Sequence, residues 1–483
     1  MRHNILFDTD IPDPDVIFHD GYYYLITTTM HFFPGGEILR SPDLKTWEHF
    51  SYVFSFLEKS GSQRLEGEEH IYGKGMWAPS LRFYDGVFYV VFSSNDTKKT
   101  CLFRSSDLKG PWVRNEIKGF YHDPSLLFDD GKAFLFYGNT DIHLTELNDG
   151  LTAPKEGGTD RVIISEENGF LGYEGSHAYK IGGKYHVFLI HSLKDRWRRV
   201  EACFSSDRID GPYEGGDVYD DDLGIRDSGI AQGGIVQGTD GTFSAVMFQD
   251  SGAVGRIPVI VPVRMDDGRP VFGTGDREVI RATVKGIYGS DNFESGLKDF
   301  WQFNHEPDMD LIRVDHGLKI RTDKTSGNIF HAKNTVTQRM NTPSCSSEVT
   351  ICASGINEGD VACLAAFIGD FALVGITKRE DGYYAVMMSN ESQGGIFDLS
   401  EDTMITEELI KLDEDILTVG ISCDFAEDTA SCYVKLNGRP VPVGKPHAMR
   451  FRLDHFTGAR FALSYYSTKI FGGEAVFTGF VRE

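Results

Sequence analysis

Short apolar runs separated by Gly-containing turns recur through the first half of the chain. Three copies of this pattern are 13–24 (DPDVIFHDGYYY), 78–89 (APSLRFYDGVFY) and 123–134 (DPSLLFDDGKAF). Two copies with one more residue before the turn follow, 174–186 (EGSHAYKIGGKYH) and 232–243 (QGGIVQGTDGTF). An Asp-Gly or Gly-Gly turn between two apolar runs is typical of a β-hairpin. The pattern therefore predicts five hairpins.

The spacing of the copies predicts how the hairpins are arranged. Successive copies begin roughly 45–65 residues apart, a period typical of propellers and solenoids. The segments between them have no helical periodicity, which favours a propeller with about four strands in each blade. Residues 1–287 are therefore predicted to form a five-bladed β-propeller with one copy in each blade.

In a propeller the inner strand of each blade faces a common axis, so the first residues of the five copies are expected near one end of that axis. These residues are Asp13, Ala78, Asp123, Glu174 and Gln232. Asp-Pro is a common start for any strand, because both residues favour turns. Three carboxyl groups at one place, however, repel one another and are costly to desolvate. Such a cluster indicates a functional site.

A different pattern begins at about residue 288. Alternating apolar and polar positions continue to the C-terminus, and Asn437-Gly438 between two such runs predicts another hairpin. Residues 288–483 are predicted to form a jelly-roll-like β-sandwich, so that the whole chain is all-β. This domain is expected either to bind sugars itself or to pack on the propeller and lend a loop to its site.

Composition narrows the class of partner. The chain has 483 residues, a net charge of −24 and a pI near 5.0, which disfavours nucleic acid and acidic membrane surfaces. A neutral ligand is expected. No run of about 18 apolar residues is present, and the N-terminus has no apolar segment of signal-peptide length, so we expect a cytoplasmic protein without a membrane partner. The seven cysteines have no metal-ligand spacing and are expected to be reduced thiols.

A pair of carboxyl groups flanking a bond is the basic equipment of glycoside hydrolysis. One must be ionised to activate water, and the other must hold a proton for the leaving oxygen, which a third acid nearby favours by repulsion. Sugars pack their C–H faces on aromatic rings, so Phe32, Phe33 and Trp77 are candidate walls of the site. Arg256, on an otherwise apolar strand, is a candidate hydrogen-bond donor to sugar hydroxyls. Core aromatic residues and a surface arginine are the alternatives.

The ordered set of segments resembles glycoside hydrolase family 43, the β-xylosidases and α-L-arabinofuranosidases. The matching pieces include IPDPDVIFHDGYYYLITTT, TMHFFPGGEILRSPDLKTWEH, MWAPSL, HDPSLLFDDGKAFLFYG, YEGSHAYKIGGKYHVFL and GRIPVIVPVRMDDGRPVFG, which span most of residues 4–275. The resemblance implies a five-bladed propeller, a β-sandwich that lends a loop to the pocket, and hydrolysis with inversion.

The resemblance also implies residue roles. Asp13 corresponds to the general base, Asp123 to the residue that tunes and orients the acid, and Glu174 to the general acid. Asp15 is the nearest competitor of Asp13, because it lies two residues farther along the same strand face. Glu166 and Glu167 compete with Glu174 for the role of acid.

One position departs from the family pattern. Many members carry a His, sometimes beside a bound calcium ion, where this chain has Gln232. We therefore count Gln232 among the substrate-binding candidates and expect no metal ligands and no required cofactor, with a structural calcium ion near the axis as the open alternative.

The expected function is an exo-acting, inverting α-L-arabinofuranosidase that releases terminal L-arabinofuranose from arabinoxylan-type hemicellulose fragments. A β-D-xylosidase acting on xylo-oligosaccharides, a bifunctional enzyme and a non-catalytic carbohydrate-binding propeller are the alternatives. A phosphorylase would need a basic cluster near the acid. Arg196, Arg198 and Arg199 form a basic run, which we expect to mark an exposed strand or loop.

Overall fold

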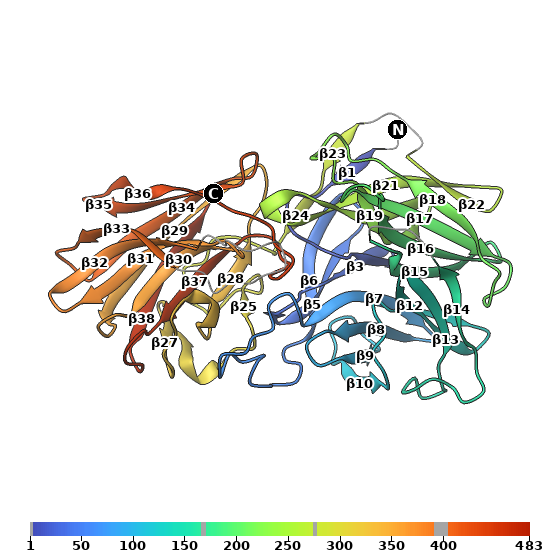
Figure 1. Ribbon diagram of the computed structural model, residues 1–483, viewed down its shortest axis with the longest axis horizontal. Helices are drawn as coiled ribbons and strands as arrows, with labels where there is room; N and C mark the ends of the chain where they lie inside the picture. Colours follow the sequence, from blue (N-terminus) through green and yellow to red (C-terminus); the bar gives the residue numbers. More distant parts are fainter. Residues whose placement is uncertain (1–2, 166–170, 274–277, 391–403) are drawn as a thin grey trace.

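The computed structural model describes residues 3–165, 171–273, 278–390 and 404–483. Over this range the regular structure is almost entirely β-strand, interrupted only by three short 3-10 turns. Two bodies lie side by side, an N-terminal five-bladed propeller and a C-terminal sandwich (Figure 1). The predicted all-β class and its two architectures are confirmed.

Each predicted hairpin forms the inner two strands of one antiparallel blade. The strands, from the axis outward, are β2 (Asp15–His19), β3 (Tyr22–Thr27), β5 (Gly35–Ser41) and β6 (Thr46–Phe54) in blade 1; β7 (Met76–Tyr84), β8 (Val87–Ser94), β9 (Lys99–Ser105) and β10 (Val113–Ile117) in blade 2; β11 (Ser125–Asp129), β12 (Lys132–Asn139), β13 (Asp141–Glu146) and β14 (Asp160–Ser165) in blade 3; β15 (Glu174–Ile181), β16 (Lys184–Ser192), β17 (Arg199–Ser206) and β18 (Glu214–Tyr219) in blade 4; and β19 (Ile230–Gln237), β20 (Phe243–Asp250), β21 (Arg256–Asp266) and β22 (Arg269–Phe272) in blade 5.

The two ends of the propeller segment close the ring. Strand β1 (Asn4–Leu6) pairs antiparallel with β21 and parallel with β23 (Val279–Arg281), so the start of the chain completes the last blade. Strand β24 (Thr283–Lys285) then pairs parallel with β6 of blade 1. These pairings cover strand edges that would otherwise be open to other chains.

A register shift occurs at the start of the inner strands β7, β15 and β19, and the residues at the same place in blades 1 and 3 directly precede β2 and β11. In β7, for example, Trp77 faces Ser93 but Ser80 faces Val91, so two residues of the inner strand are bulged out of register. The first bulged residue has a positive φ in each blade: 49° at Asp13, 31° at Ala78, 46° at Asp123, 64° at Gly175 and 57° at Gln232. A bulge re-aims side chains at a strand end, and repeated strain at one place is typical of functional sites.

This register corrects one detail of the sequence alignment. In blade 4, Glu174 faces Ile190 and His177 faces Phe188, so Gly175, and not Glu174, is the equivalent of Asp123. Glu174 is therefore the counterpart of Trp77 and precedes the bulge by one residue. The extra residue before the blade 4 turn made the sequence repeat ambiguous by one position. A side chain at residue 175 would collide with Gln232, whose Cγ lies 2.7 Å from an added Cβ.

The C-terminal domain packs two antiparallel sheets face to face. The first sheet has the order β33 (Ile405–Lys411), β32 (Gly382–Ser389), β31 (Ala372–Arg379), β30 (Val361–Phe367), β37 (Arg460–Tyr466), β28 (Val336–Arg339) and β25 (Gln302–Asn304). The second has the order β26 (Ile312–Val314), β27 (Leu318–Arg321), β38 (Glu474–Arg482), β29 (Ser344–Gly355), β34 (Ile416–Asp424), β35 (Thr429–Leu436) and β36 (Arg439–Ala448). The predicted Asn437-Gly438 turn joins β35 to β36 and is confirmed.

Strand pairing joins the two domains directly. Strand β4 (Phe32–Phe33) leaves blade 1 and becomes the edge strand of the first sandwich sheet by pairing with β25. Nearby, Arg339 of the sandwich forms a buried ion pair with Glu37 of blade 1, at 3% and 1% side-chain exposure. Since an unpaired charge at this depth would be costly, the pair fixes how the domains meet.

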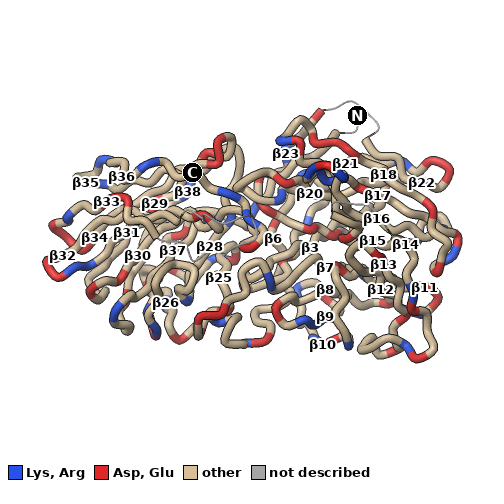
Figure 2. Tube along the Cα trace, viewed as in Figure 1, with Lys and Arg blue, Asp and Glu red and all other residues tan. Residues whose placement is uncertain are grey.

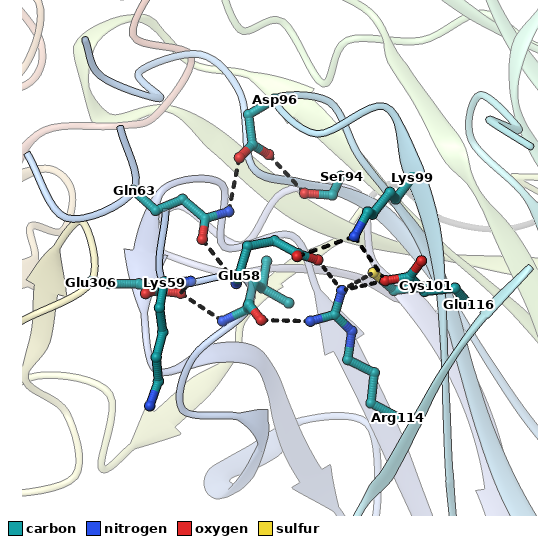
Figure 3. A network of polar contacts seen from close by, with 11 residues as sticks. Glu58, Lys59, Gln63, Ser94, Asp96, Lys99, Cys101, Arg114, Glu116 and Glu306 are labelled. Carbon is teal, nitrogen blue, oxygen red and sulfur yellow. Dashed lines mark hydrogen bonds and ion pairs between the residues drawn. The ribbon is translucent and has the colours of Figure 1, made fainter. Parts of the chain in front are cut away.

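The long connection between β6 and β7 contacts both domains through polar groups (Figure 3). The Oε1 atom of Glu306, from the sandwich, accepts a hydrogen bond from the backbone N–H of Leu57 at 2.6 Å. From blade 2, Arg114 donates to the carbonyl of Leu57 at 2.5 Å and pairs with Glu58. Lys99 contacts the same Glu58 carboxylate at 3.1 Å. The connection is therefore held by ion pairs and hydrogen bonds on two sides.

Charged residues are spread over both domains, with many of the acidic ones in turns (Figure 2). None of the described helical segments has the length and apolarity needed to cross a membrane.

Candidate active site

The structure brings the three predicted carboxyl groups together at the axis. Asp13 and Asp123 occupy equivalent bulges and are 6% and 7% exposed, whereas the Glu174 side chain is 16% exposed. Burial raises the pKa of Asp123 to about 7, and the carboxylates of Glu174 and Asp13 act in the same direction. At neutral pH, Asp123 therefore holds a proton for much of the time.

His122 lies between two of these carboxyls. Its Nε2 atom is 3.2 Å from Glu174 Oε2 and 3.5 Å from Asp123 Oδ2. Burial by itself would lower the pKa of His122, but Asp123 and Glu174 override it and raise the pKa to about 9. The imidazole is therefore positively charged at neutral pH and neutralises part of the acidic cluster.

Asn139 fixes the orientation of Glu174. Its Nδ2 atom, at the end of β12, donates a hydrogen bond of 2.6 Å to Glu174 Oε2. The same oxygen faces His122 Nε2. Both partners occupy one oxygen of the carboxyl group, which leaves Oε1 as the atom with capacity to carry and release a proton.

Arg256, from the neighbouring blade 5, binds Asp13. It begins β21, is 2% exposed, and its Nη1 donates to Asp13 Oδ1 at 2.9 Å. Its backbone N–H donates to Asp10 Oδ1 at 2.7 Å, and its Nη2 donates to the carbonyl of Phe456 at 3.2 Å. Arg256 is thus a buried partner of a predicted catalytic residue and not a surface arginine.

Two half-buried aromatic rings lie beside the carboxyl cluster. Trp77 makes edge contacts with His122 and with Phe456, each with ring centroids 5.9 Å apart. The Trp77 indole N–H is buried without a hydrogen-bond partner, so a donor toward a ligand oxygen is available. The guanidinium of Arg256 stacks on the Phe456 ring, 4.4 Å from its centroid.

Phe456 comes from the sandwich domain, through the loop between β36 and β37. The backbone N–H of Phe456 donates to the carbonyl of Arg452, and Gly458 N–H donates to Asp10 of the propeller at 3.0 Å. A side chain at residue 458 would meet the carbonyl oxygen of Val254 at 2.0 Å, so only glycine permits this approach. The sandwich therefore lends an aromatic residue to the propeller axis, as the resemblance implies.

Phe32 and Phe33 lie elsewhere, in the interior between the domains, which corrects their assignment to the site. Each is 1% exposed. Arg460 stacks on Phe32 at 3.7 Å, and Phe33 packs against Phe54 in the core of blades 1 and 2. Their strand pairing with β25 explains the aromatic content of this segment as interdomain packing.

Gln232 lies at the axis beside Glu174, with 5% exposure. Its backbone N–H donates to Glu201 Oε2 at 2.8 Å. Burial raises the pKa of the Glu201 carboxyl well above its usual range. We derive no step from a calcium ion at Gln232.

One group in the described ranges has the spacing of metal ligands. The ligand atoms of His122, Asp123 and Glu174 lie within 4.8 Å of one another. Two members of this group, Asp123 and Glu174, are among the carboxyls that the sequence predicts to be catalytic.

Asp15 has a structural environment that differs from that of Asp13. It is fully buried, with Oδ2 2.5 Å from Arg82 Nη1 and Oδ1 3.1 Å from His177 Nδ1. Although burial raises its pKa, Arg82 and His177 together lower it to about 2. Arg82 also donates to Ser125, so this cluster ties four blades together. Glu166 and Glu167, the competitors of Glu174, lie outside the described residues.

Three residues of the site were not identified from the sequence. His122 directly precedes Asp123 in HDPS, and Asn139 ends the same hairpin, so their proximity to Asp123 was readable from the repeat. Phe456 lies more than 400 residues from Asp13 along the chain, and no local pattern indicates the contact.

Both domains match models of known protein families. The model for glycosyl hydrolases family 43 matches residues 3–270, and the model for the β-xylosidase C-terminal concanavalin A-like domain matches residues 290–481. A β-xylosidase of Formosa agariphila is 24% identical over 81% of this chain and 78% of its own length. A non-reducing end α-L-arabinofuranosidase of Bacteroides ovatus is 30% identical over 54% of this chain and 51% of its own.

Solved structures with the same two-domain arrangement are also similar. A chain described as a bifunctional GH43-CE protein of Bacteroides eggerthii superposes with a TM-score of 0.90 at 35% identity, covering 98% of this chain. This chain spans 62% of the length of that one. An engineered GH43 glycoside hydrolase, described as displaying both endo-xylanase and exo-arabinofuranosidase activity, superposes with a TM-score of 0.87 at 26% identity, covering 98% of each chain. With a family model matched over more than half of its length, the chain belongs to glycosyl hydrolases family 43.

Proposed function

We propose that the protein is an exo-acting, inverting α-L-arabinofuranosidase that removes terminal L-arabinofuranose from arabinoxylan-type hemicellulose fragments. The observation that carries the proposal is the set of three carboxyls at the axis, with Asp13 and Glu174 in contrasting environments. Asp13 is held by a guanidinium, whereas Glu174 lies near Asp123, whose pKa burial raises to about 7.

In this proposal Asp13 accepts a proton from water as the water oxygen bonds to the anomeric carbon. The glycosidic bond breaks at the same time, and its oxygen takes the proton from Glu174. Donation occurs from Oε1, because Oε2 is occupied by Asn139 and His122. Asp123, which is about half protonated at neutral pH because burial raises its pKa to about 7, limits the negative charge around the acid.

A β-D-xylosidase is the second candidate, and a bifunctional enzyme is compatible with both. The β-D-xylosidase is favoured by the relative from Formosa agariphila, which is named a β-xylosidase, and by the match to a β-xylosidase C-terminal domain. Arabinofuranose and xylose present similar hydroxyl groups to the same carboxyls, so the chemical step is shared.

The experiment that tests the proposal compares release of nitrophenolate from the α-L-arabinofuranoside and the β-D-xyloside by the unsubstituted enzyme and by Asp13→Ala. We expect a preference for the arabinofuranoside and a loss of turnover of about 10³-fold or more in the variant, because the water loses its base. Preference for the xyloside would replace the first candidate by the second. Turnover of neither glycoside would reject both, and near-normal turnover by Asp13→Ala would reject the assignment of the base.

A further inference from the structure

Three histidine side chains are buried in the interior where the propeller and the sandwich meet. His31 directly precedes β4, His305 directly follows β25, and His455 lies in the loop between β36 and β37, next to Phe456. Each of the three is at most 1% exposed. The proposed reaction uses none of them. We refer to His31, His305 and His455 as the histidine cluster.

The rings of the histidine cluster pack against one another and around one tyrosine. The His31 ring centroid lies 5.3 Å from that of His305 and 5.0 Å from that of His455. Tyr72, in the connection between β6 and β7, lies 4.6 Å from His305 and stacks on His455 at 5.1 Å. His70, of the same connection, contacts Tyr72 at 5.1 Å. These contacts join segments of both domains.

The hydrogen bonds of the cluster require neutral rings. The Nε2 atom of His305 accepts the backbone N–H of Ile71 at 2.9 Å, which only an unprotonated nitrogen can do, and its Nδ1 faces the Asn304 amide oxygen at 3.2 Å. Within the described residues, both nitrogens of His31 and the Nε2 atom of His455 have no hydrogen-bond partner. A proton added to one of these rings would break a bond or would lack an acceptor.

Burial and neighbouring cations also favour the neutral rings. Burial is the largest cause that lowers the imidazole pKa, well below the ordinary 6.5 for His31 and His305 and to about 3 for His455. Several charged or titratable groups around the rings act in the same direction. They are His70, Lys324, His331, Arg452 and Arg460.

Two acidic side chains adjoin rings of the cluster along the chain. Glu306 accepts the backbone N–H of Leu57 at 2.6 Å, and Asp454 pairs with Arg452 at 2.5 Å. Both carboxyls are therefore engaged by partners outside the histidine cluster.

His455 connects the cluster to the propeller axis. It directly precedes Phe456, and its Nδ1 atom lies 2.8 Å from the hydroxyl of Thr457. Phe456 stacks on Arg256, which binds Asp13. Moving His455 away from its neighbours would therefore withdraw Phe456 from the axis.

We propose that the histidine cluster is an acid-sensitive anchor for the loop that carries Phe456. With the rings neutral, His455 packs between His31 and Tyr72 and holds Phe456 over Arg256. Below about pH 6.5, where a free histidine gains a proton, a released loop takes up protons that the packed loop excludes, so that release becomes more favourable. Only the consequence for turnover rests on the proposed function.

Hydrogen exchange of residues 449–458, measured by mass spectrometry between pH 7.5 and 5.0 and corrected for the intrinsic rate, tests the anchor. We expect protection of this loop to fall at least about tenfold per pH unit below pH 6.5, because each histidine that is protonated on release contributes that factor. Strand β13 belongs to blade 3, which contributes no residue to the cluster, and should keep its protection.

His31→Phe distinguishes proton uptake by the cluster from general damage by acid. Because both nitrogens of His31 lack partners, an apolar ring removes the titrating group without leaving a polar atom unpaired. Between pH 7.5 and 5.5 we expect the loop of this variant to lose about tenfold less protection than that of the unsubstituted protein. His31→Gln should behave in the same way. His316→Asn, at an exposed position with a positive φ, is the control and should leave the pH dependence unchanged.

Loop protection that is independent of pH, or that falls equally in β13, would overturn the anchor. An unchanged pH dependence in both His31 variants would overturn it as well. These measurements need no substrate, so they decide the anchor even if neither glycoside is hydrolysed and the proposed function fails. If the arabinofuranoside is hydrolysed, its kcat/KM should fall less steeply below pH 6.5 in His31→Phe than in the unsubstituted enzyme.

Discussion

At the scale of single residues, the proposed function depends on two acids, Asp13 and Glu174, that have different hydrogen-bond partners. Glu174 has one oxygen occupied by Asn139 and His122, whereas Asp13 is paired with Arg256. The backbone makes this possible, because a positive φ at the bulge turns Asp13 and Asp123 toward the axis. Such strain persists only where the surrounding structure enforces it.

Replacing the acid should make the rate depend on the leaving group. For Glu174→Ala we expect turnover of an unactivated oligosaccharide to fall by about 10³-fold, and turnover of a nitrophenyl glycoside to fall far less, because nitrophenolate needs little protonation. Steady-state kinetics on the two substrates checks this. An equal loss on both would show that Glu174 is not the acid.

Replacing His122 should shift the pH profile. The positive charge of His122 lowers the pKa of Asp123, which burial and the neighbouring carboxylates raise to about 7. In His122→Gln that charge is absent, so Asp123 keeps its proton to higher pH, and we expect the alkaline limb of kcat/KM to move up by about one pH unit. A limb that stays in place or moves down would contradict the role of His122. His143→Gln, on the outer part of blade 3, is the control.

The residue scale was only partly readable from the sequence. The Asp-Pro repeats located Asp13 and Asp123, and Glu174 was found although the true register differs by one residue. Phe32 and Phe33 were misplaced because an aromatic pair beside a strand has the same pattern whether it lines a pocket or packs between domains. The pattern of apolar residues along the sequence indicates that a side chain is buried, but it does not indicate which residues it packs against.

At the scale of strands and blades, buried ion pairs connect elements that backbone hydrogen bonds do not. Asp15 on β2 contacts Arg82 on β7 and His177 on β15, and so links blades 1, 2 and 4 close to the axis. Glu37 on β5 and Arg339 on β28 do the same between the domains. Removing one partner leaves a buried charge without compensation.

Asp15→Asn should therefore destabilise the propeller while leaving the catalytic groups in place. We expect a loss of about 3–5 kcal/mol in the free energy of unfolding, seen as a lower melting temperature at pH 7. Asp266→Asn, which removes an exposed pair with Arg264, is the matched control and should change stability by less than about 1 kcal/mol.

The pH dependence of this loss has a definite sign. The pKa of Asp15 is lowered to about 2 in the folded protein from its ordinary 3.8, so its stabilising effect is complete above the ordinary value and is lost as pH falls toward 2. The difference in melting temperature between the unsubstituted protein and Asp15→Asn should shrink over that window. A difference independent of pH would show that the carboxylate charge is not what stabilises the propeller.

The element scale was the most predictable. Gly turns between apolar runs specify hairpins locally, and the recurrence of hairpins specifies blades, so all five inner pairs lie where the sequence placed them. The closure by β1, β21 and β23 was not foreseen, because it joins segments that are far apart along the chain and carry no turn signal.

At the scale of the whole molecule, the two domains form one site. The sandwich supplies Phe456, which lies over Arg256 and contacts Phe451 of the same loop. The propeller supplies β4 to the sandwich sheet in return. The sequence indicated that a loop would reach the propeller, but contacts across a domain boundary leave no periodic signal that identifies it.

Phe456→Ala should weaken catalysis without loosening the domains. The ring covers Arg256 and contacts Trp77, and we expect its loss to lower kcat/KM about tenfold or more on nitrophenyl glycosides, with the melting temperature almost unchanged. Ile470→Ala, at an exposed position of the same domain, should leave kcat/KM unchanged. Unaltered kinetics in Phe456→Ala would show that the sandwich has no part in the site.

In the proposed reaction, Asp13 directs a water molecule to the anomeric carbon from the face opposite Glu174. The most direct test is proton NMR of the first sugar released from an α-L-arabinofuranoside, recorded before mutarotation. We expect β-L-arabinofuranose as the initial product, with the α anomer appearing only later. Initial release of the α anomer would show retention through a covalent intermediate and would contradict the role of Asp13 as the base that activates water.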